Sequence, residues 1–161
     1  MKYLKDIETL EELKKQYHKW AMQLHPDLGG DDEAMKLLNH EYESLFGQVK
    51  DKHINKEGET YQKATSETKE MFTNIINALV KMNGIHIEII GCFIWVTGNT
   101  KPHKEALKAL GMKWHYKKQC WFLSPEGYRR FGKKEYSMNE IRSMYGVEYS
   151  ENVRLREIRE G

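Results

Sequence analysis

The chain has 161 residues, of which 39% are hydrophobic and 31% charged, and its formal net charge is +2. This composition is typical of a folded protein with one domain or two small ones. No apolar run approaches the ~18 residues of a membrane-spanning helix, and the N-terminus lacks the apolar stretch of a secretory signal. Cys92 and Cys120 are the two cysteines, which excludes a disulfide framework and CxxC metal patterns. We therefore expect a reducing, cytoplasmic compartment, no metal and no cofactor.

Charge is divided unevenly along the chain. Residues 1–60 hold 9 lysines and arginines against 13 acidic residues, whereas residues 84–145 hold 11 against 5. Such asymmetry predicts different partners for the two halves.

Two helices are predicted near the N-terminus. Apolar residues recur at helical spacing over residues 9–24, in the stripe Leu10, Leu13, Tyr17, Ala21 and Leu24. Thr9 and Glu12 form a capping box, and Pro26 ends this helix because the residue before a proline avoids the α region. A second helix is predicted over residues 31–46, with the stripe Met35, Leu38, Tyr42 and Leu45 and an end at Gly47. The stripes predict an antiparallel hairpin over residues 1–47.

The remaining chain predicts an α+β fold overall. Residues 48–65 are polar and indicate a linker, and residues 66–84 have the spacing of a connecting amphipathic helix. Within residues 85–146, the runs IHIEII and FIWVT predict one hairpin, and KWHYK and CWFL predict another about Lys118–Gln119. A helix between the hairpins and short helices after them, SPEGYRRF and SMNEIRSMYG, give a ββαββα unit. Residues 147–161 form an unassigned charged tail.

The tripeptide His25-Pro26-Asp27, followed by two glycines, lies at the tip of the helical hairpin. No serine or cysteine nucleophile accompanies His25 and Asp27, which argues against catalysis. No third fixed ligand accompanies them either, which argues against a metal site. Taken alone, the tripeptide indicates an ordinary helix-breaking turn, and nowhere does the sequence predict an enzyme.

The flanking residues favour a more specific interpretation. The stretch EELKKQYHKWAMQLHPD resembles the second helix and loop of J-domain (DnaJ-like) co-chaperones, and the resemblance continues into the next helix, over about residues 9–46. The stretch HPDLGGDDEAMKLLN is also similar to the J-domain of polyomavirus T antigens. His18 replaces the arginine usual in the family, and Gln23 replaces a frequent lysine. The first helix is shortened or missing and the fourth is not evident, so we expect the core to borrow packing from the helix at 66–82.

This resemblance implies a co-chaperone or adaptor that docks on a DnaK-type ATPase chaperone and stimulates it. His25, Pro26 and Asp27 would form the docking loop, with Asp27 perturbing the chaperone. A basic face beside the apolar stripe would position the loop and steer an acidic partner. That face consists of Lys14, Lys15, His18 and Lys19. The C-terminal unit would choose the target, and a nucleoprotein complex is one such target.

The C-terminal unit supports an alternative function, nucleic-acid binding with the helical hairpin as scaffold. Basic residues beside aromatic ones can follow a phosphate backbone and stack on bases. The candidates are Lys101, Lys104, Lys113, His115, Lys117 and Lys118. A helix start at Asn99–Pro102 is a candidate phosphate site. In a unit this small, however, the aromatic residues are also expected in the core: Trp95, Trp114, Trp121 and Phe122. The basic residues would then be ordinary solvated lysines, or part of a protein-binding surface. Cys92 and Cys120 fall in predicted strands and indicate inert packing.

Overall fold

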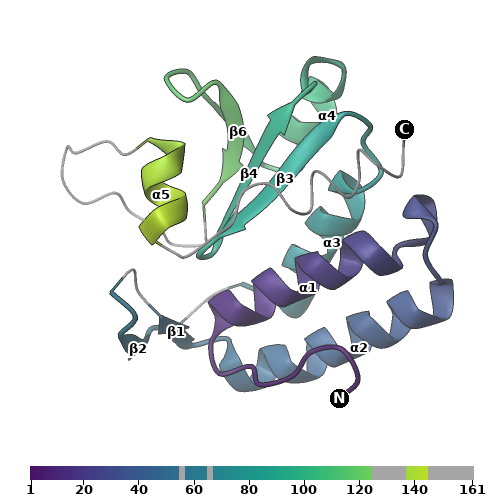
Figure 1. The fold of residues 1–161 in the computed structure, drawn as a ribbon, viewed down its shortest axis with the longest axis vertical. Coiled ribbons are helices and arrows are strands. Elements are labelled where there is room, and N and C mark those ends of the chain that lie inside the picture. The colour runs from purple at the N-terminus through teal and green to yellow at the C-terminus, as the bar shows by residue number, and fades with distance from the viewer. Residues whose placement is uncertain (55–56, 65–66, 125–136, 145–161) are drawn as a thin grey trace.

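A computed structural model describes residues 1–54, 57–64, 67–124 and 137–144 (Figure 1). Its helices are α1 (Leu10–Leu24), α2 (Asp32–Val49), α3 (Lys69–Leu79), α4 (Lys104–Ala109) and α5 (Met138–Met144), with short 3-10 turns η1 (Pro26–Leu28) and η2 (Lys101–His103). Its strands are β1 (Lys52–Ile54), β2 (Thr60–Gln62), β3 (Ile85–Ile90), β4 (Phe93–Gly98), β5 (Lys113–His115) and β6 (Cys120–Leu123). This mixture of helices and antiparallel strands confirms the α+β class.

The predicted helical hairpin is present as α1 and α2, and both predicted starts are confirmed. The Thr9 hydroxyl accepts a hydrogen bond from the Glu12 backbone N–H at 3.3 Å, and the Asp31 side chain caps α2 at Ala34. The facing stripes are fully buried or nearly so: Leu10, Leu13, Tyr17 and Ala21 on α1, and Met35, Leu38, Tyr42 and Phe46 on α2. The predicted end at Gly47 is wrong, because buried Val49 extends the apolar stripe of α2 by one more step.

Residues 1–8 form no helix, as the sequence leads us to expect. They run extended along the hairpin, where Leu4 is buried. The buried Glu41 carboxylate on α2 holds this segment by accepting hydrogen bonds from the backbone N–H groups of Tyr3 and Leu4, each at 3.0 Å. A carboxylate that receives charge-assisted bonds in this way tolerates burial.

Helix α3 completes the helical core. The Phe72 ring stacks on Tyr42 with ring centroids 5.8 Å apart and meets the edge of Tyr17 at 5.9 Å, and Ile76 is fully buried. The expectation that the hairpin borrows packing from the helix at 66–82 is therefore confirmed, although α3 itself is shorter than predicted.

The predicted linker over residues 48–65 is wrong in part, because it contains a small antiparallel hairpin of β1 and β2. His53 pairs with Tyr61 in its register, and their rings stack at 5.2 Å. The strands are three residues each and mainly polar. They therefore lack the apolar alternation by which a strand is recognised in a sequence.

The C-terminal sheet confirms the two predicted hairpins and the helix between them. Its strand order is β3-β4-β6-β5, with every neighbouring pair antiparallel. Strand β5 ends at His115, two residues earlier than predicted, because residues 116–119 form the turn. Helix α5 matches one predicted short helix; the other, SPEGYRRF, and the tail at 147–161 lie outside the described residues.

The sheet buries both of its faces. One face joins the core of the helices, so that a single cluster of buried side chains runs from α1–α3 into the sheet. This face carries Ile85, Ile87, Ile89, Ile94, Val96 and Trp121. The opposite face forms a second cluster with α5, and it carries Ile90, Trp95, Cys120 and Phe122. In Figure 1, α1 lies between α2 and the sheet. Among the described helices, none combines the length and apolar character needed to cross a membrane.

Candidate functional site

The HPD tip folds into a tight corner in which both glycines have a steric role. The backbone N–H groups of Leu28 and Gly30 both donate to the His25 carbonyl at 3.0 Å. Gly29 adopts a left-handed φ of +86°, which side chains disfavour. At Gly30, an added Cβ would lie 2.1 Å from the Leu24 carbonyl oxygen, so only glycine fits against the end of α1. The corner is thus fixed by close backbone contacts.

His25 supports this corner from inside. The residue is only 6% exposed, and its Nδ1 accepts a hydrogen bond from the Asp27 backbone N–H at 3.1 Å. The ring therefore carries its proton on the other nitrogen, which suits its hydrogen bond with the side chain of Asn77 on α3. Burial lowers the pKa of His25, although the Asp27 carboxylate opposes the shift. A neutral imidazole thus joins the corner to α3.

Asn77 extends this connection through both hairpin helices. Its Nδ2 donates to the Tyr17 hydroxyl at 3.0 Å, and that hydroxyl donates to the Asn39 amide oxygen at 2.6 Å. One polar network therefore links α1, α2, α3 and the HPD corner. A satisfied network of this kind fixes a single arrangement of its members.

Pro26 and Asp27 form the outward side of the corner. Pro26 is exposed, and 53% of the Asp27 side chain is accessible. His25, which the resemblance places in the docking loop with Pro26 and Asp27, is nearly buried, and its ring holds the Asp27 backbone instead of facing outward. The corner therefore presents a rigid proline and an exposed carboxylate, whose Oδ2 lies 4.0 Å from His25 Nδ1.

The predicted basic face loses two of its four members. Lys14 is buried beneath α3, where its Nζ lies 2.8 Å from the Glu67 carboxylate and 5.2 Å from the centre of the Phe72 ring. His18 is buried as well. This half of the face is covered because α3 and the sheet pack on it, a tertiary contact that helical spacing cannot reveal.

His18 is buried and uncharged at neutral pH. Desolvation lowers its pKa to about 4, and within the described part of the chain its Nε2 has no hydrogen-bond partner. At neutral pH this residue therefore brings no positive charge to the surface of α1.

Lys15 and Lys19 remain exposed and lie one helical turn apart. Gln23, also exposed, continues the same line by a further turn toward the corner. The exposed residues of this line and of the corner that follows it are together called the docking stripe: Lys15, Lys19, Gln23, Pro26 and Asp27. The docking stripe therefore has two positive charges on α1, at Lys15 and Lys19, and one carboxylate at the corner, Asp27.

The C-terminal candidates are spread over several elements. Lys101 lies on η2 and Lys104 on α4, and both are exposed, as are Lys113 on β5 and Lys117 in the following turn. Lys118 is half-buried. Helix α4 has no side-chain cap and only six residues, which does not favour the predicted phosphate site at Asn99–Pro102.

The aromatic residues of this unit divide between core and surface. Trp95 and Trp121 are buried as predicted, and His115 packs edge-on against the Phe122 ring at 5.8 Å. Trp114, by contrast, is exposed on edge strand β5, and Tyr116 in the next turn is 84% exposed. The prediction of Trp114 in the core is therefore wrong, because β5 has a neighbour on one side only.

The sequence patterns do not predict one cluster of side chains that could bind a metal ion. Glu11 on α1, His53 on β1 and Cys92 in the β3–β4 turn bring one ligand atom each to within 4.8 Å of the others. Burial raises the pKa of the Cys92 thiol to about 12, which opposes its use as a free nucleophile. Glu11 and His53 are 42 positions apart in the sequence, and His53 and Cys92 are 39 positions apart. No local spacing could therefore group them.

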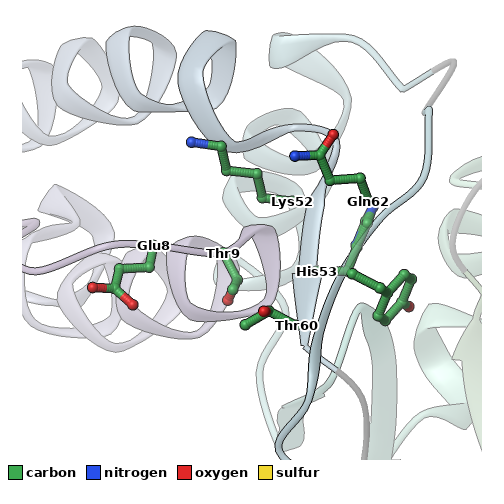
Figure 2. Close-up of a pocket in the computed structure, with 7 residues that line it drawn as sticks. Glu8, Thr9, Lys52, His53, Thr60 and Gln62 are labelled. Carbon is green, nitrogen blue, oxygen red and sulfur yellow. The ribbon is translucent and has the colours of Figure 1, made fainter.

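A polar cavity of about 380 Å³ lies beside this cluster, between the N-terminal end of α1 and the β1–β2 hairpin. Figure 2 shows Lys52, His53, Thr60 and Gln62 of the hairpin, with Glu8 and Thr9 of the other wall. Its lining offers hydrogen-bonding groups from both walls.

Comparisons with known proteins returned no match: no family model, no curated protein and no solved structure matches this chain. Function therefore has to follow from the residues and their geometry.

Proposed function

We propose that this protein is a J-domain co-chaperone, which docks on a DnaK-type ATPase chaperone through the docking stripe and stimulates its ATP hydrolysis. The sheet and α5 would select the target that is delivered. The observation that carries the proposal is the corner itself: Pro26 and Asp27 are exposed at the end of a two-lysine line, on a backbone held from within by His25 and Asn77.

The charges of the stripe fit this role. Exposed lysines attract an acidic partner and mainly raise the rate of encounter, while contributing little to affinity. Lys15 and Lys19 supply this steering in the structure, without Lys14 and His18. Two steering charges predict weaker recruitment, and a smaller dependence on salt, than the four that the sequence suggests.

The rigidity of the corner also fits a docking role. A docking element that is already ordered loses little conformational entropy when it binds. The left-handed turn at Gly29, the close approach at Gly30 and the fixed φ of Pro26 all restrict the backbone before a partner arrives. Asp27 can then place its carboxylate at a defined point on the chaperone, while the chaperone performs the hydrolysis.

The test is the rate of single-turnover ATP hydrolysis by a DnaK-type chaperone in the presence of the full chain. The wild type is expected to accelerate hydrolysis, and Asp27→Asn is expected to abolish the acceleration. Glu33→Gln is the matched control, since it neutralises another exposed carboxylate near the same corner, 82% accessible at the start of α2. A wild-type chain without effect, or equal loss in both variants, would refute the proposal.

A second candidate, single-stranded nucleic-acid binding, is favoured by the exposed rings of Trp114 and Tyr116 beside Lys113 and Lys117. Exposed aromatics that stack on bases are worth about 1–3 kcal/mol each. Fluorescence anisotropy with a labelled oligonucleotide across a salt series tests it. We expect affinity to fall with salt and with Tyr116→Ser; no binding at low ionic strength would remove this candidate.

A further inference from the structure

We propose that Glu11, His53 and Cys92 form a binding site for one zinc-like divalent cation. A carboxylate, an imidazole and a thiolate are three of the ligand types that zinc takes in proteins. Their ligand atoms all lie within 4.8 Å of one another, and His53 Nδ1 and Glu11 Oε1 are 3.0 Å apart. In a tetrahedral zinc site, bonds of about 2.0–2.3 Å place neighbouring ligands roughly 3.3–3.6 Å apart. Small side-chain adjustments would bring the three into that geometry.

The orientation of His53 is what a metal ligand requires. Its Nε2 lies 3.2 Å from the Lys63 carbonyl oxygen, which can only accept a hydrogen bond. Nε2 therefore carries the ring proton, and in the neutral ring Nδ1 points a lone pair at the Glu11 carboxylate. Metal-binding histidines are typically fixed in this way by a backbone carbonyl on their second nitrogen.

Two acceptors facing each other at 3.0 Å need a positive charge between them. A proton on Nδ1 would supply it and would make a simple ion pair of His53 and Glu11. The third group distinguishes the alternatives, because the Cys92 thiol converges on the same point and hydrogen-bonds the Glu11 carboxylate. An ion pair between His53 and Glu11 does not require a thiol, whereas a thiolate is the soft ligand that favours zinc among divalent ions.

Glu11 is held in place from the other side. Its second oxygen, Oε2, accepts a hydrogen bond from the Ile54 backbone N–H at 3.2 Å, which leaves Oε1 directed at His53. The nearby Lys14 ammonium, which lines a small cavity with Cys92, is paired with Glu67 at 2.8 Å. The adjacent positive charge is therefore already compensated.

The placement of the ligands indicates what the cation would do. They come from the first turn of α1, from β1 and from the turn between β3 and β4. One ion would thus join the helical hairpin, the β1–β2 hairpin and the sheet. Three protein ligands leave a fourth position for water. Because such an ion binds the folded chain and not the unfolded one, it would act as a clamp on the fold.

The test uses the full-length chain, prepared with reduced thiols and treated with a chelator. Co²⁺ is added as a spectroscopic probe, and Zn²⁺ is then titrated against it. We expect one equivalent of Co²⁺ to produce a near-ultraviolet thiolate-to-metal absorption band, Zn²⁺ to displace it, and Zn²⁺ to raise the melting temperature. Cys92→Ser and His53→Gln should lose the band while circular dichroism shows that they remain folded.

Cys120→Ala is the matched control, because it removes the second cysteine, which is buried on the opposite face of the sheet. The band should persist in this variant. Absence of a stoichiometric band in the folded wild type, or a band that survives in Cys92→Ser, would overturn the proposal and leave His53 and Glu11 as an ion pair. Should Cys92→Ser fail to fold, Glu11→Gln and His53→Gln carry the same test. None of these readouts involves a chaperone, so the result is separate from that of the proposed function.

Discussion

The Lys14 ammonium and the Glu67 carboxylate lie 2.8 Å apart with only 3% and 10% of their side chains exposed. This buried ion pair ties α1 to the segment that precedes α3, and it takes Lys14 away from the surface on which the sequence places it. Of the neighbouring lysines on α1, Lys15 and Lys19 are exposed. The two kinds of lysine should respond differently to mutation.

Lys14→Ala should destabilise the protein by about 3 kcal/mol, because it removes the ammonium group that pairs with the buried Glu67 carboxylate. Lys15→Ala removes an exposed charge and should change the free energy of unfolding by about 0.5 kcal/mol or less. Urea unfolding followed by circular dichroism measures both. Equal effects of the two substitutions would show that the buried pair does not contribute to stability.

Asn77→Ala should affect the corner from a distance. It removes the hydrogen bonds to His25 and Tyr17, so we expect a loss of about 1–3 kcal/mol in stability and weaker stimulation of the chaperone. Asn74→Ala is the control, since Asn74 lies exposed on the same helix and should leave both properties nearly unchanged. Full stimulation by a folded Asn77→Ala protein would mean that the network does not position Asp27.

Gly30→Ala tests the packing of the corner. The new Cβ would clash with the Leu24 backbone, so the turn must move, and we expect the protein to lose about 1–3 kcal/mol of stability.

Gly47→Ala should have the opposite effect on stability. Gly47 lies within α2 with open space around its Cα, so alanine should stabilise the protein by up to about 1 kcal/mol. Thermal melts of the two variants should shift in opposite directions; a shift in the same direction would contradict this geometry.

His18 should make stability depend on pH. Its pKa is lowered from 6.5 to about 4 in the fold, so the unfolded chain binds the proton more readily. The protein is therefore fully stabilised above about pH 6.5, and stability is lost as the pH falls toward 4. The loss between pH 7.5 and pH 5 should be about 2 kcal/mol, and the lowered pKa of His25 acts in the same direction.

His18→Leu should remove most of that acid sensitivity, as urea unfolding at pH 7.5 and pH 5 can show. His86→Leu, at a half-buried position on β3, serves as the comparison. A His18→Leu protein with undiminished pH dependence would locate the titrating group elsewhere.

Much of the fold could be predicted from the sequence, because the signals were local. Thr9, Pro26 and the apolar stripes mark α1 and α2, and the β-branched runs mark the two hairpins of the sheet. The β1–β2 hairpin could not be predicted in this way. Its strands are short and polar, and they depend on the contact of His53 with Glu11 on α1, which lies 42 residues away in the chain.

In the candidate site, too, local sequence predicts some features, whereas others depend on tertiary contacts. The HPD corner follows from a short motif, whereas the inward position of His25 and the burial of Lys14 and His18 depend on α3 and the sheet. Helical spacing identifies which residues share a face, but it does not identify which faces are covered. The Glu11–His53–Cys92 cluster is the extreme case, since three separate elements create it.

The central claim, that a positioned Asp27 triggers the chaperone and two lysines guide it there, is tested most directly by a titration. Single-turnover ATP hydrolysis by the DnaK-type chaperone is measured against increasing concentrations of wild type, Asp27→Asn and the double variant Lys15→Glu/Lys19→Glu. The wild type should raise the rate to a plateau. Asp27→Asn should show no rise at any concentration. The double variant should reach the same plateau at roughly tenfold higher concentration at low salt, because its reversed charges repel the acidic partner during encounter while Asp27 is unchanged. A rise with Asp27→Asn equal to that of the wild type would contradict the claim.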